Sequence, residues 1–511
     1  MNEIKTIGIV GAGAMGRGIA QIAAQAGLEV LLFDVNAQAV AAARENLQQM
    51  WSKLAGKGKI SDELAAASLE RVTPCSQLQD MSRADLVVEA IVERLDVKRE
   101  LFQQLEAIVA PSCILASNTS SLSITAIAAG CKQPGRVAGY HFFNPVPLMK
   151  VVEIIDGLRT EPEVGDALMT LARRMGHTPV RAKDMPGFIV NHAGRGMNIE
   201  GLRLAQEAVA PFYQVDAIMR EQAGFRMGPF ELLDLTALDV SHPVMESIYH
   251  QFYDEPRFRP SPITAVRFAG GLLGRKTGEG FYRYPEGKQQ VPQAPAVPEL
   301  APGLRVWVAP YHSVGHKRAS ALLRDLGVGV IATDTPPSDA LIVVTPYGED
   351  TSSVVGKHQL DGERTVALDT FFGLEKGKRR VVMCSPATLP QWRDAAHALF
   401  ASDGTAVSVI DDSAGFVGQR MVASIVNVAC DIAQQTIASP EDIGLAVSLG
   451  LGYPMGGPLS MGDTLGAAHV LEILRAMYKV TGDSRYRASL WLQRRVQLGL
   501  PLSASPACVA R

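Results

Sequence analysis

The chain has 511 residues, of which 47% are apolar and 20% are charged, and its net charge is -3. This length is enough for several domains with large buried cores, and the composition is that of a globular protein. The near balance of charges and the lack of a basic tract argue against nucleic-acid binding, and no apolar stretch reaches the roughly 18 residues of a membrane span.

Residues 1–185 alternate between strand-like and helical patterns. Short β-branched runs such as I-K-T-I-G-I-V and L-E-V-L-L-F-D-V are separated by helical stretches at 15–26, 36–54 and 95–109. Continuous apolar strands that alternate with helices are typical of a parallel sheet covered by helices on both faces. We therefore predict a doubly wound α/β domain of the Rossmann type.

The first strand leads into a glycine-rich loop, G-A-G-A-M-G, and then into a helix. Glycines there allow a tight turn and let backbone amides approach a pyrophosphate at the helix N-terminus. Asp34 ends the second strand, where its carboxylate would bind the ribose hydroxyls of NAD and repel the 2′-phosphate of NADP. The order of these elements predicts an NAD-binding domain at 1–185, with these loop residues in contact with the cofactor: Gly11, Ala12, Gly13, Ala14, Met15 and Gly16.

From Pro186 onward the pattern becomes helical, with short breaks and almost no strand-like run. We predict an all-α domain at 186–284. Residues 285–302 contain five prolines and few bulky apolar residues, so we predict a linker there.

Beyond the linker the chain repeats itself. The stretch that ends at Asp334 resembles the stretch that ends at Asp34. Four more pairs of segments are similar: 338–346 to 83–91, 365–370 to 113–119, 413–420 to 185–192, and 452–463 to 224–234. We therefore predict a degenerate Rossmann-like domain at 303–411 and a second helical domain at 412–511.

One histidine and one glutamate of the first copy stand in strongly apolar surroundings. His141 lies at the C-terminal end of the strand R-V-A-G-Y, at the edge where doubly wound sheets bind their ligands. Glu153 lies within V-V-E-I-I, where an unpaired carboxylate would be costly. We expect the two side chains to pair, so that the carboxylate fixes one imidazole tautomer and the imidazole acts as a general base.

The second copy lacks the residues that the first copy would use. At an offset of 300 residues the loop glycines become Tyr311, Ser313 and His316, whose side chains would fill the space of a pyrophosphate. Residues 379–388, which we align with the histidine strand, contain no histidine, and Gln419 replaces Asn191. We predict that the second copy is inactive and does not bind NAD.

Five segments of the first copy are distinctive: S-N-T-S-S-L (117–122), H-F-F-N-P-V-P-L-M-K-V-V-E-I-I (141–155), D-M-P-G-F-I-V-N (184–191), M-G-P-F-E-L-L-D (227–234) and G-R-K-T-G-E-G-F-Y (274–282). With them, residues 1–284 resemble the 3-hydroxyacyl-CoA dehydrogenase family over nearly their whole length. The resemblance implies a catalytic pair, His141 and Glu153, assisted by Ser120 and Asn191. It also implies that the helical domain at 186–284 binds substrate and forms dimers.

The same resemblance implies ligand contacts. The implied NAD contacts beyond the glycine loop and Asp34 are Glu93, Lys98, Ser120, Asn144 and Lys276. Coenzyme A is expected to contact Lys53 and Ser120. Lys53 lies near Lys57 and Lys59, a cluster that would attract phosphates, although a solvated helix end is the structural alternative.

The implied reaction is the NAD-dependent oxidation of (S)-3-hydroxyacyl-CoA to 3-oxoacyl-CoA. The two-copy layout is similar to that of bacterial family members that oxidise 3-hydroxyadipyl-CoA in phenylacetate breakdown, so this substrate is our first expectation. A 3-hydroxybutyryl-CoA dehydrogenase is the near alternative, and Arg195 and Arg226 are candidates to bind a terminal carboxylate. A non-enzymatic NAD-binding relative, like the lens crystallins recruited from this family, and a dehydrogenase of free hydroxy acids stay open as rivals.

We expect an acyl-CoA thioester as substrate, and neither nucleic acid nor a membrane as partner. The two helical domains are expected to pair within one chain as the subunits of a dimer would, and a homo-oligomer stays open. The six cysteines show no C-x-x-C and no metal-ligand spacing, so we expect reduced thiols and no metal. Because the N-terminus enters a strand at once, we expect no signal peptide and a cytoplasmic location.

Overall fold

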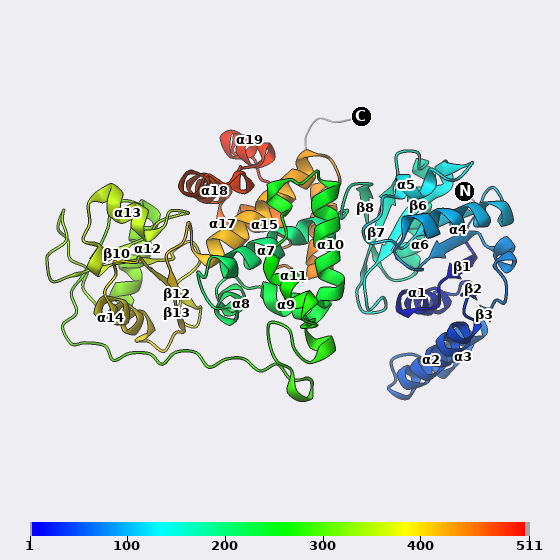
Figure 1. Cartoon of the computed structure of the whole chain (residues 1–511), viewed down its shortest axis with the longest axis horizontal. Coiled ribbons are helices and arrows are strands. Elements are labelled where there is room, and N and C mark those ends of the chain that lie inside the picture. The colour runs from blue at the N-terminus through cyan, green and yellow to red at the C-terminus, as the bar shows by residue number, and fades with distance from the viewer. Residues whose placement is uncertain (1–2, 506–511) are drawn as a thin grey trace. The chain divides into compact units, whose positions relative to one another are not determined.

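The computed structural model describes residues 3–505 and divides into two compact units (Figure 1). The first unit comprises residues 3–192, residues 432–452 and Ser505. The second unit comprises residues 193–431 and 453–504. A segment of the second copy, 432–452, therefore belongs to the same compact unit as the predicted NAD-binding domain.

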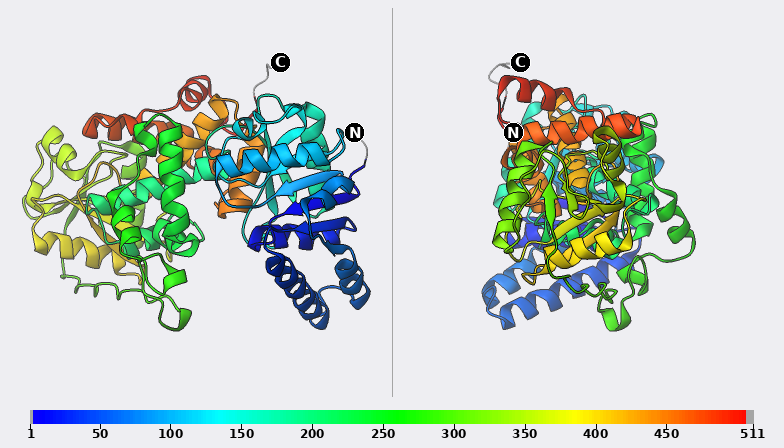
Figure 2. Two further views of the ribbon diagram at one scale, coloured as in Figure 1. Left: turned by 45° about the vertical axis from the view of Figure 1, so that its right-hand side comes forward. Right: turned by 90° about the vertical axis from the view of Figure 1, so that its left-hand side faces the viewer.

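An eight-stranded sheet in the order β3-β2-β1-β4-β5-β6-β7-β8 forms the centre of the first unit. Its strands are β1 (Thr6–Val10), β2 (Glu29–Phe33), β3 (Val72–Pro74), β4 (Leu86–Glu89), β5 (Ile114–Ser117), β6 (Val137–Phe142), β7 (Val151–Asp156) and β8 (Thr178–Lys183). The helices between them are α1 (Ala14–Gln25), α2 (Ala37–Gly56), α3 (Asp62–Glu70), α4 (Leu95–Ile108), α5 (Ile124–Ala128) and α6 (Pro162–Arg174). Helices α2 and α3 pack against each other and extend beyond the edge of the sheet (Figure 2).

Alternate residues of the central strands face opposite helical layers. Ile7 and Ile9 of β1 belong to one apolar cluster, whereas Val10 belongs to the other. Val30 and Leu31 of β2 divide in the same way. Both faces of the sheet are covered, which explains the continuous apolar runs in the sequence. The predicted doubly wound fold is confirmed.

The last two strands run against the other six, which the sequence did not indicate. β7 pairs with β6 in antiparallel fashion, and β8 is parallel to β7. The connection between β6 and β7, residues 143–150, is too short for the helical crossover that parallel neighbours need. The strand of His141 and the strand of Glu153 are therefore paired neighbours.

A helical region follows. Helix α7 (Val190–Gln206) crosses from the first unit into the second, and α8 (Phe212–Glu221), α9 (Pro229–Thr236), α10 (Leu238–Gln251) and α11 (Pro262–Ala269) complete it. Residues 291–305 contain no helix or strand, and most of them are exposed. The predicted bounds of this helical domain, 186–284, and of the linker, 285–302, remain predictions.

The second copy has a five-stranded sheet in the order β13-β12-β11-β10-β9. Its strands are β9 (Val306–Val308), β10 (Leu341–Val344), β11 (Thr365–Leu368), β12 (Arg380–Cys384) and β13 (Val407–Asp411), with α12 (Ser313–Asp325), α13 (Thr351–His358) and α14 (Pro390–Ala401) around them. The helices that follow are α15 (Val417–Gln434), α16 (Pro440–Leu451), α17 (Pro458–Leu465), α18 (Ala467–Thr481) and α19 (Leu490–Leu498).

Strands β10 to β13 are the counterparts of β5 to β8. β11 and β12 are antiparallel, and Leu368 faces Val382 as Tyr140 faces Ile154. A buried arginine precedes β6 and β11 alike: Arg136 donates to the carbonyl oxygens of Ala110 and Cys113, and Arg364 donates to those of Pro337 and Ala340. The two sets of strands are thus related by an offset of 228 residues, as from Arg136 to Arg364.

This correspondence shows that three of our sequence alignments were wrong by one strand. Residues 338–346 correspond to β5 and not to 83–91, and residues 365–370 correspond to β6 and not to 113–119. Residues 379–388 correspond to the glutamate strand β7 and not to the histidine strand. Short β-branched runs resemble one another, so only pairing direction, caps and buried arginines distinguish them.

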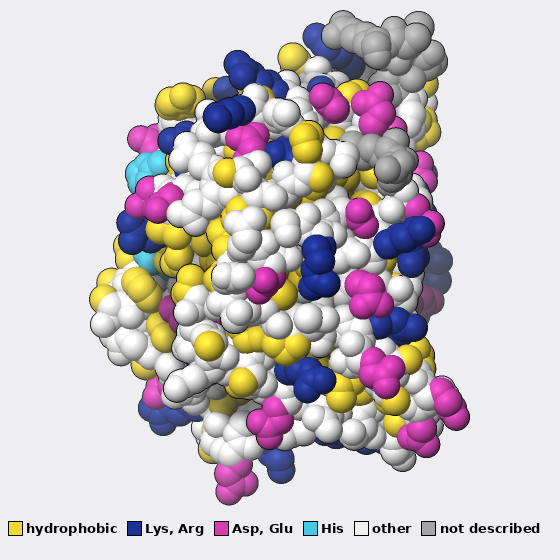
Figure 3. Space-filling view, turned by 90° about the vertical axis from the view of Figure 1, so that its right-hand side faces the viewer, with side chains coloured by type: hydrophobic (Ala, Val, Ile, Leu, Met, Phe, Trp, Pro, Cys, Tyr) yellow, Lys and Arg dark blue, Asp and Glu magenta, His cyan; other side chains and the backbone are white. Residues whose placement is uncertain are grey.

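Within residues 3–505, no helix has both the length and the apolar character to cross a membrane. On the face drawn in Figure 3, basic and acidic side chains are interspersed and do not gather into a patch of one sign. Cys75, Cys113, Cys131, Cys384 and Cys430 are free thiols, and Cys508 lies outside the described residues.

Candidate active site

The loop between β1 and α1 leaves room for a pyrophosphate. Gly11 has a φ of +109°, and a Cβ there would lie 2.4 Å from the carbonyl oxygen of Ala90. A Cβ on Gly16 would lie 1.8 Å from the carbonyl oxygen of Gly11, so both positions require glycine. Gly13 caps α1 without a side-chain hydrogen bond, and nothing lies within 4 Å of its Cβ position. The start of α1 at Gly13 is thus unobstructed, as an anion site requires.

Asp34 lies beside this loop at the end of β2. Its Oδ2 accepts a hydrogen bond from the Ala12 amide (2.8 Å), and its Oδ1 accepts one from the Asn36 amide (2.9 Å). The carboxylate is thereby fixed where the ribose of a dinucleotide would reach it. The uncapped helix, the open position at Gly13 and this acid together fit NAD.

His141 and Glu153 face each other across β6 and β7. They are direct partners in the antiparallel register, and His141 Nδ1 lies 2.6 Å from Glu153 Oε2. The carboxylate is fully buried and the imidazole is 5% exposed. With Nδ1 engaged, Nε2 is the ring nitrogen that can meet a substrate.

The N-terminus of α7 holds the glutamate. Its other oxygen, Oε1, accepts hydrogen bonds from the amides of Ile189 and Val190, both at 2.9 Å. These amides are aimed at Glu153 by a tight turn in which Gly187 and Phe188 have φ values of +75° and +49°. Helix N-termini favour negative charge and offer unpaired amides, so this arrangement explains how an apolar strand accommodates the carboxyl group of a glutamate.

Ser120 and Asn191 lie close to each other in the first unit. Asn191 Nδ2 donates to the carbonyl oxygen of Ser120 at 3.3 Å, so the side chain of one residue is tied to the backbone of the other. Ser120 follows β5, and Asn191 is the second residue of α7, directly after the amides that bind Glu153. Two neutral hydrogen-bonding residues thus stand beside the loop and the turn that form this site.

Glu93 organises the loop of Ser120. Its Oε1 accepts hydrogen bonds from Thr119 Oγ1 (2.6 Å) and from the Ser120 amide (2.9 Å). Burial works against its ionised form, but the charge of Lys98 and these hydrogen bonds outweigh burial and hold the pKa of Glu93 below its ordinary value. Lys98 itself is 1% exposed and binds Glu89 (2.5 Å) and Glu93 (3.2 Å). Lys98 therefore supports the Ser120 loop through its ion pair with Glu93.

A cavity of about 760 Å³ lies on the first unit beside α1. Its lining includes Asn144 and four basic residues, Arg17, Lys59, Lys150 and Arg174, and no acidic residue. Lys53, which the resemblance implied as a coenzyme A contact, is exposed on α2 and is not among the lining residues.

Three further predicted residues belong to the second unit. Lys276 is exposed, and its ammonium binds Asp239. Arg226 is exposed, whereas Arg195 is buried, and burial lowers the pKa of Arg195 to about 10. The cavity that Arg195 lines has a volume of only about 20 Å³, so it does not admit an acyl chain.

The second copy has different side chains at the equivalent positions. Asp369 takes the place of His141, and its amide donates to the carbonyl oxygen of Val381, which takes the place of Glu153. Gln419, which replaces Asn191, donates to Asp369 Oδ1 at 2.9 Å, and Gln222 donates to Oδ2 at 3.2 Å. Burial raises the pKa of Asp369 to about 6. These amides fill the region that corresponds to the reacting site of the first copy.

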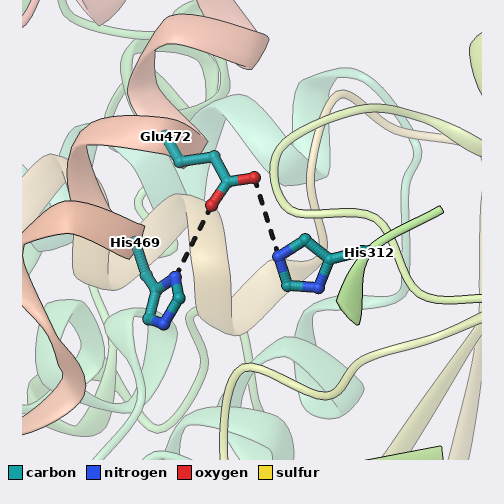
Figure 4. Close-up of side chains that lie close together, drawn as sticks. All are labelled: His312, His469 and Glu472. Atoms are coloured by element: carbon teal, nitrogen blue, oxygen red, sulfur yellow. Dashed lines mark ion pairs between the residues drawn. The ribbon is translucent and has the colours of Figure 1, made fainter. Parts of the chain in front are cut away.

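A histidine closes the loop between β9 and α12, which we aligned with the glycine loop by sequence, although β9 pairs with β10 as β4 pairs with β5. His312 caps α12 by accepting the Gly315 amide on Nδ1 (3.0 Å), so its proton lies on Nε2, which faces Glu472 at 3.6 Å. His469 Nδ1 lies 3.5 Å from the other oxygen of Glu472 (Figure 4). A metal ion binds a neutral imidazole through the lone pair of its unprotonated nitrogen. In His312 that nitrogen is Nδ1, which already accepts the Gly315 amide, so Nε2 has no lone pair for a metal ion. The carboxylate of Glu472 thus links the start of α12 to α18.

Several residues of the site were not anticipated from the sequence. Thr119, Arg17 and Lys150 are ordinary polar residues whose place depends on tertiary structure. The turn at Gly187 and Phe188 had a local signal, a glycine after a proline at the start of a helical pattern, but its use as an anchor for Glu153 had none.

Two models of known protein domains match the chain. The 3-hydroxyacyl-CoA dehydrogenase NAD binding domain matches residues 6–185. The C-terminal domain of 3-hydroxyacyl-CoA dehydrogenase matches twice, at residues 187–284 and 415–507.

Individual relatives agree with these matches. The 3-hydroxyadipyl-CoA dehydrogenase of Escherichia coli (strain K12) is 36% identical over 98% of both chains. The 3-hydroxybutyryl-CoA dehydrogenase of Bradyrhizobium diazoefficiens is 37% identical over 57% of this chain and 98% of its own. A crystal structure described as 3-hydroxybutyryl-CoA dehydrogenase from E. coli K12 has a TM-score of 0.85 and 34% identity, and the match covers 98% of this chain and 99% of that one. The chain belongs to the 3-hydroxyacyl-CoA dehydrogenase family, whose NAD-dependent oxidation of 3-hydroxyacyl-CoA it shares.

Proposed function

We propose that His141 and Glu153 form the proton-transfer pair of this dehydrogenase, with Ser120 and Asn191 as their assistants. The 2.6 Å contact between the two side chains is the observation that supports this most directly. It leaves one imidazole nitrogen available at the edge of the sheet where the glycine loop also ends.

In this mechanism His141 Nε2 takes the proton of the C3 hydroxyl as the C3–O bond becomes a carbonyl. Bound NAD⁺ supplies the acceptor for the hydride that leaves C3. The imidazolium that forms is stabilised by Glu153, whose charge is held by the amides of Ile189 and Val190. Ser120 and Asn191 donate hydrogen bonds to the C3 oxygen and the thioester as charge moves. In the reverse direction His141 returns the proton.

The basic cavity beside α1 is the proposed site for the phosphates of coenzyme A. Arg17, Lys59 and Lys150 supply positive charge there without a competing acid in the lining. Lys59→Ala is expected to raise the KM for a 3-hydroxyacyl-CoA by about three- to tenfold, as loss of one charged hydrogen bond would. The KM for the matching N-acetylcysteamine thioester, which lacks the phosphates, should not change. Lys53→Ala tests the alternative position.

For the acyl group we propose 3-hydroxyadipyl. Support comes from the two-copy layout and from the full-length similarity to an enzyme named for this substrate. The alternative is 3-hydroxybutyryl, the substrate in the name of the similar crystal structure. NAD reduction measured across a panel of thioesters decides, and a kcat/KM that is higher for 3-hydroxybutyryl-CoA would contradict the proposal. The free hydroxy acids in the same panel test the rival that acts without coenzyme A.

We also propose that the two helical domains pair within the chain as subunits of a dimer would. The equivalent helices α7 and α15 approach closely, since a Cβ on Gly196 would lie 2.8 Å from Cα of Ile425. Arg420 of α15 donates to Glu200 and Glu207 of α7, both at 2.7 Å. On this basis a single chain needs no second copy of itself to bury these surfaces.

A further inference from the structure

Helix α16 belongs to the second copy but packs on the sheet of the first copy. It contacts β7 and β8 within the first compact unit. The approach to the helix is fixed by Lys183, whose amide donates to the carbonyl oxygen of Ile437 and whose ammonium donates to Thr436 Oγ1, both at 2.8 Å. Ile443 and Val447 of α16 are completely buried.

The C-terminal end of α16 reaches the residues that hold Glu153. At Gly450 the helix lies so close to α7 that a Cβ would stand 3.2 Å from both Cγ methyl groups of Val190. The same Cβ would lie 3.6 Å from Cγ1 of Val151, two residues before Glu153 on β7. Val190 is 2% exposed, so its side chain is enclosed by neighbouring residues, and protein interiors are closely packed.

The backbone of Val190 continues this contact to the reacting site. Its amide donates to Glu153 Oε1 at 2.9 Å, and Glu153 Oε2 binds His141 at 2.6 Å. Gly450 is therefore connected to the His141 imidazole through the packed side chain of Val190 and two hydrogen bonds of Glu153. A displacement of Val190 shifts an amide that fixes the carboxylate.

We infer that Gly450 of the second copy is a positioning residue for the His141–Glu153 pair of the first copy. Its lack of a side chain lets α16 close on Val190 and hold the start of α7 against Glu153. The second copy thus packs against Val190, whose amide holds the Glu153 carboxylate. This inference rests on the proposed role of Glu153.

The test is Gly450→Val, which places a Cβ 3.2 Å from both methyl groups of Val190 and adds two methyl groups to that Cβ. Displacements of about 1 Å at a catalytic group can cost up to about 10²-fold in rate, so we expect kcat to fall at least about tenfold. The KM values for NAD⁺ and for the thioester should stay within about twofold, since neither binding site is touched. The double variant Gly450→Val with Val190→Ala removes the colliding methyl groups and should recover most of kcat.

Gly356→Val is the matched control. Gly356 also lies in a helix of the second copy, α13, and nothing lies within 4 Å of its Cβ position. The Gly356→Val variant measures how much kcat changes when a β-branched residue replaces a helical glycine without a collision. NADH titration by fluorescence verifies that each variant is folded and binds cofactor.

Three results would overturn the inference. The first is a kcat of Gly450→Val equal to that of Gly356→Val. The second is a rise in KM that matches the loss in kcat, and the third is a double variant no more active than the single one. Glu153→Gln separates the two proposals. If it stays fully active, the proposed function fails, whereas an inactive Glu153→Gln beside an unimpaired Gly450→Val defeats the inference alone.

Discussion

At the end of β6 in the first copy, His141 faces Glu153, whereas at the equivalent place in the second copy the Asp369 amide donates to the carbonyl oxygen of Val381. The strands around both pairs have the same order and direction. In the first copy the residue after the glycine of the turn, Phe188, has a φ of +49°, and two amides reach Glu153. In the second copy only the glycine, Gly415, has a positive φ.

The comparison shows which features belong to the fold and which belong to the reaction. Left-handed backbone at a non-glycine residue costs about 1–3 kcal/mol, and Phe188 has it where its turn aims amides at Glu153, the carboxylate that we propose for proton transfer. The buried arginines before β6 and β11 occur in both copies, so they serve the sheet. The two copies share the strand order and the buried arginines, and they differ in the residues that we propose for proton transfer.

Replacement of the two equivalent residues should give the largest contrast. His141→Gln is expected to lower kcat by at least about 10²-fold, because a general base is lost. Asp369→Asn at the equivalent position of the second copy should leave kcat unchanged. Steady-state rates of NAD reduction measure both. An Asp369→Asn enzyme as impaired as His141→Gln would mean that the second copy takes part in the reaction.

Removal of the second copy tests whether the first is complete without it. A chain that ends at residue 290 lacks α16 and α15, which leaves β7, β8 and α7 uncovered. We expect kcat to fall at least about tenfold, with a tendency to aggregate or dimerise. Size-exclusion chromatography and activity are the measurements. A soluble, monomeric fragment as active as the whole chain would refute both intrachain pairing and the role of α16.

The two acids at the ends of the similar stretches form another matched pair. Asp34→Asn should raise the KM for NAD⁺ by about tenfold, since a charged hydrogen-bond partner of the ribose is lost. Asp334→Asn should have no effect, because Asp334 is exposed in a copy that we predict does not bind NAD. Initial rates at varied NAD⁺ concentration measure both. Equal changes would indicate a nucleotide site in the second copy.

The smallest expected effect is a pH dependence of stability. Burial raises the pKa of Asp369 to about 6, so the folded protein binds this proton more tightly than the unfolded chain, in which an aspartate titrates near 3.9. The stability that this group contributes is complete below about pH 4 and is lost as the pH rises to about 6.

Asp369→Asn does not titrate, so its stability relative to the natural protein should improve from about pH 4.5 to pH 7, by roughly 1–3 kcal/mol. Thermal unfolding at both pH values measures this difference, with the exposed Asp334→Asn as control. Parallel curves for Asp369→Asn and the natural protein would contradict the expected titration of Asp369.

The sequence was informative where a local pattern has one physical meaning. The glycine loop, Asp34, the helical region and the existence of a repeat follow from spacing and periodicity. The proximity of His141 to Glu153 was predictable because neither apolar strand could otherwise tolerate its ionisable residue.

Other features depend on tertiary structure and could not be predicted. The antiparallel pairing of β6 with β7 could not be predicted, because the residue pattern of an apolar strand does not show whether it runs parallel or antiparallel to its neighbour. The alignment of the second sheet was off by one strand for the same reason. Two contacts also had no local signal in the sequence. They are the ion pair of Lys98 with Glu93 and the close approach of Gly450 to Val190.

The inclusion of residues 432–452 in the first compact unit has a consequence for synthesis. The catalytic domain lacks its last helix until about 260 residues after residue 192 have left the ribosome. At 5–20 residues per second this delay lasts roughly 13–50 s. During that time the parts of β7 and β8 that α16 contacts stay uncovered, so we expect a nascent chain to reach its full activity only after residue 452 has been made.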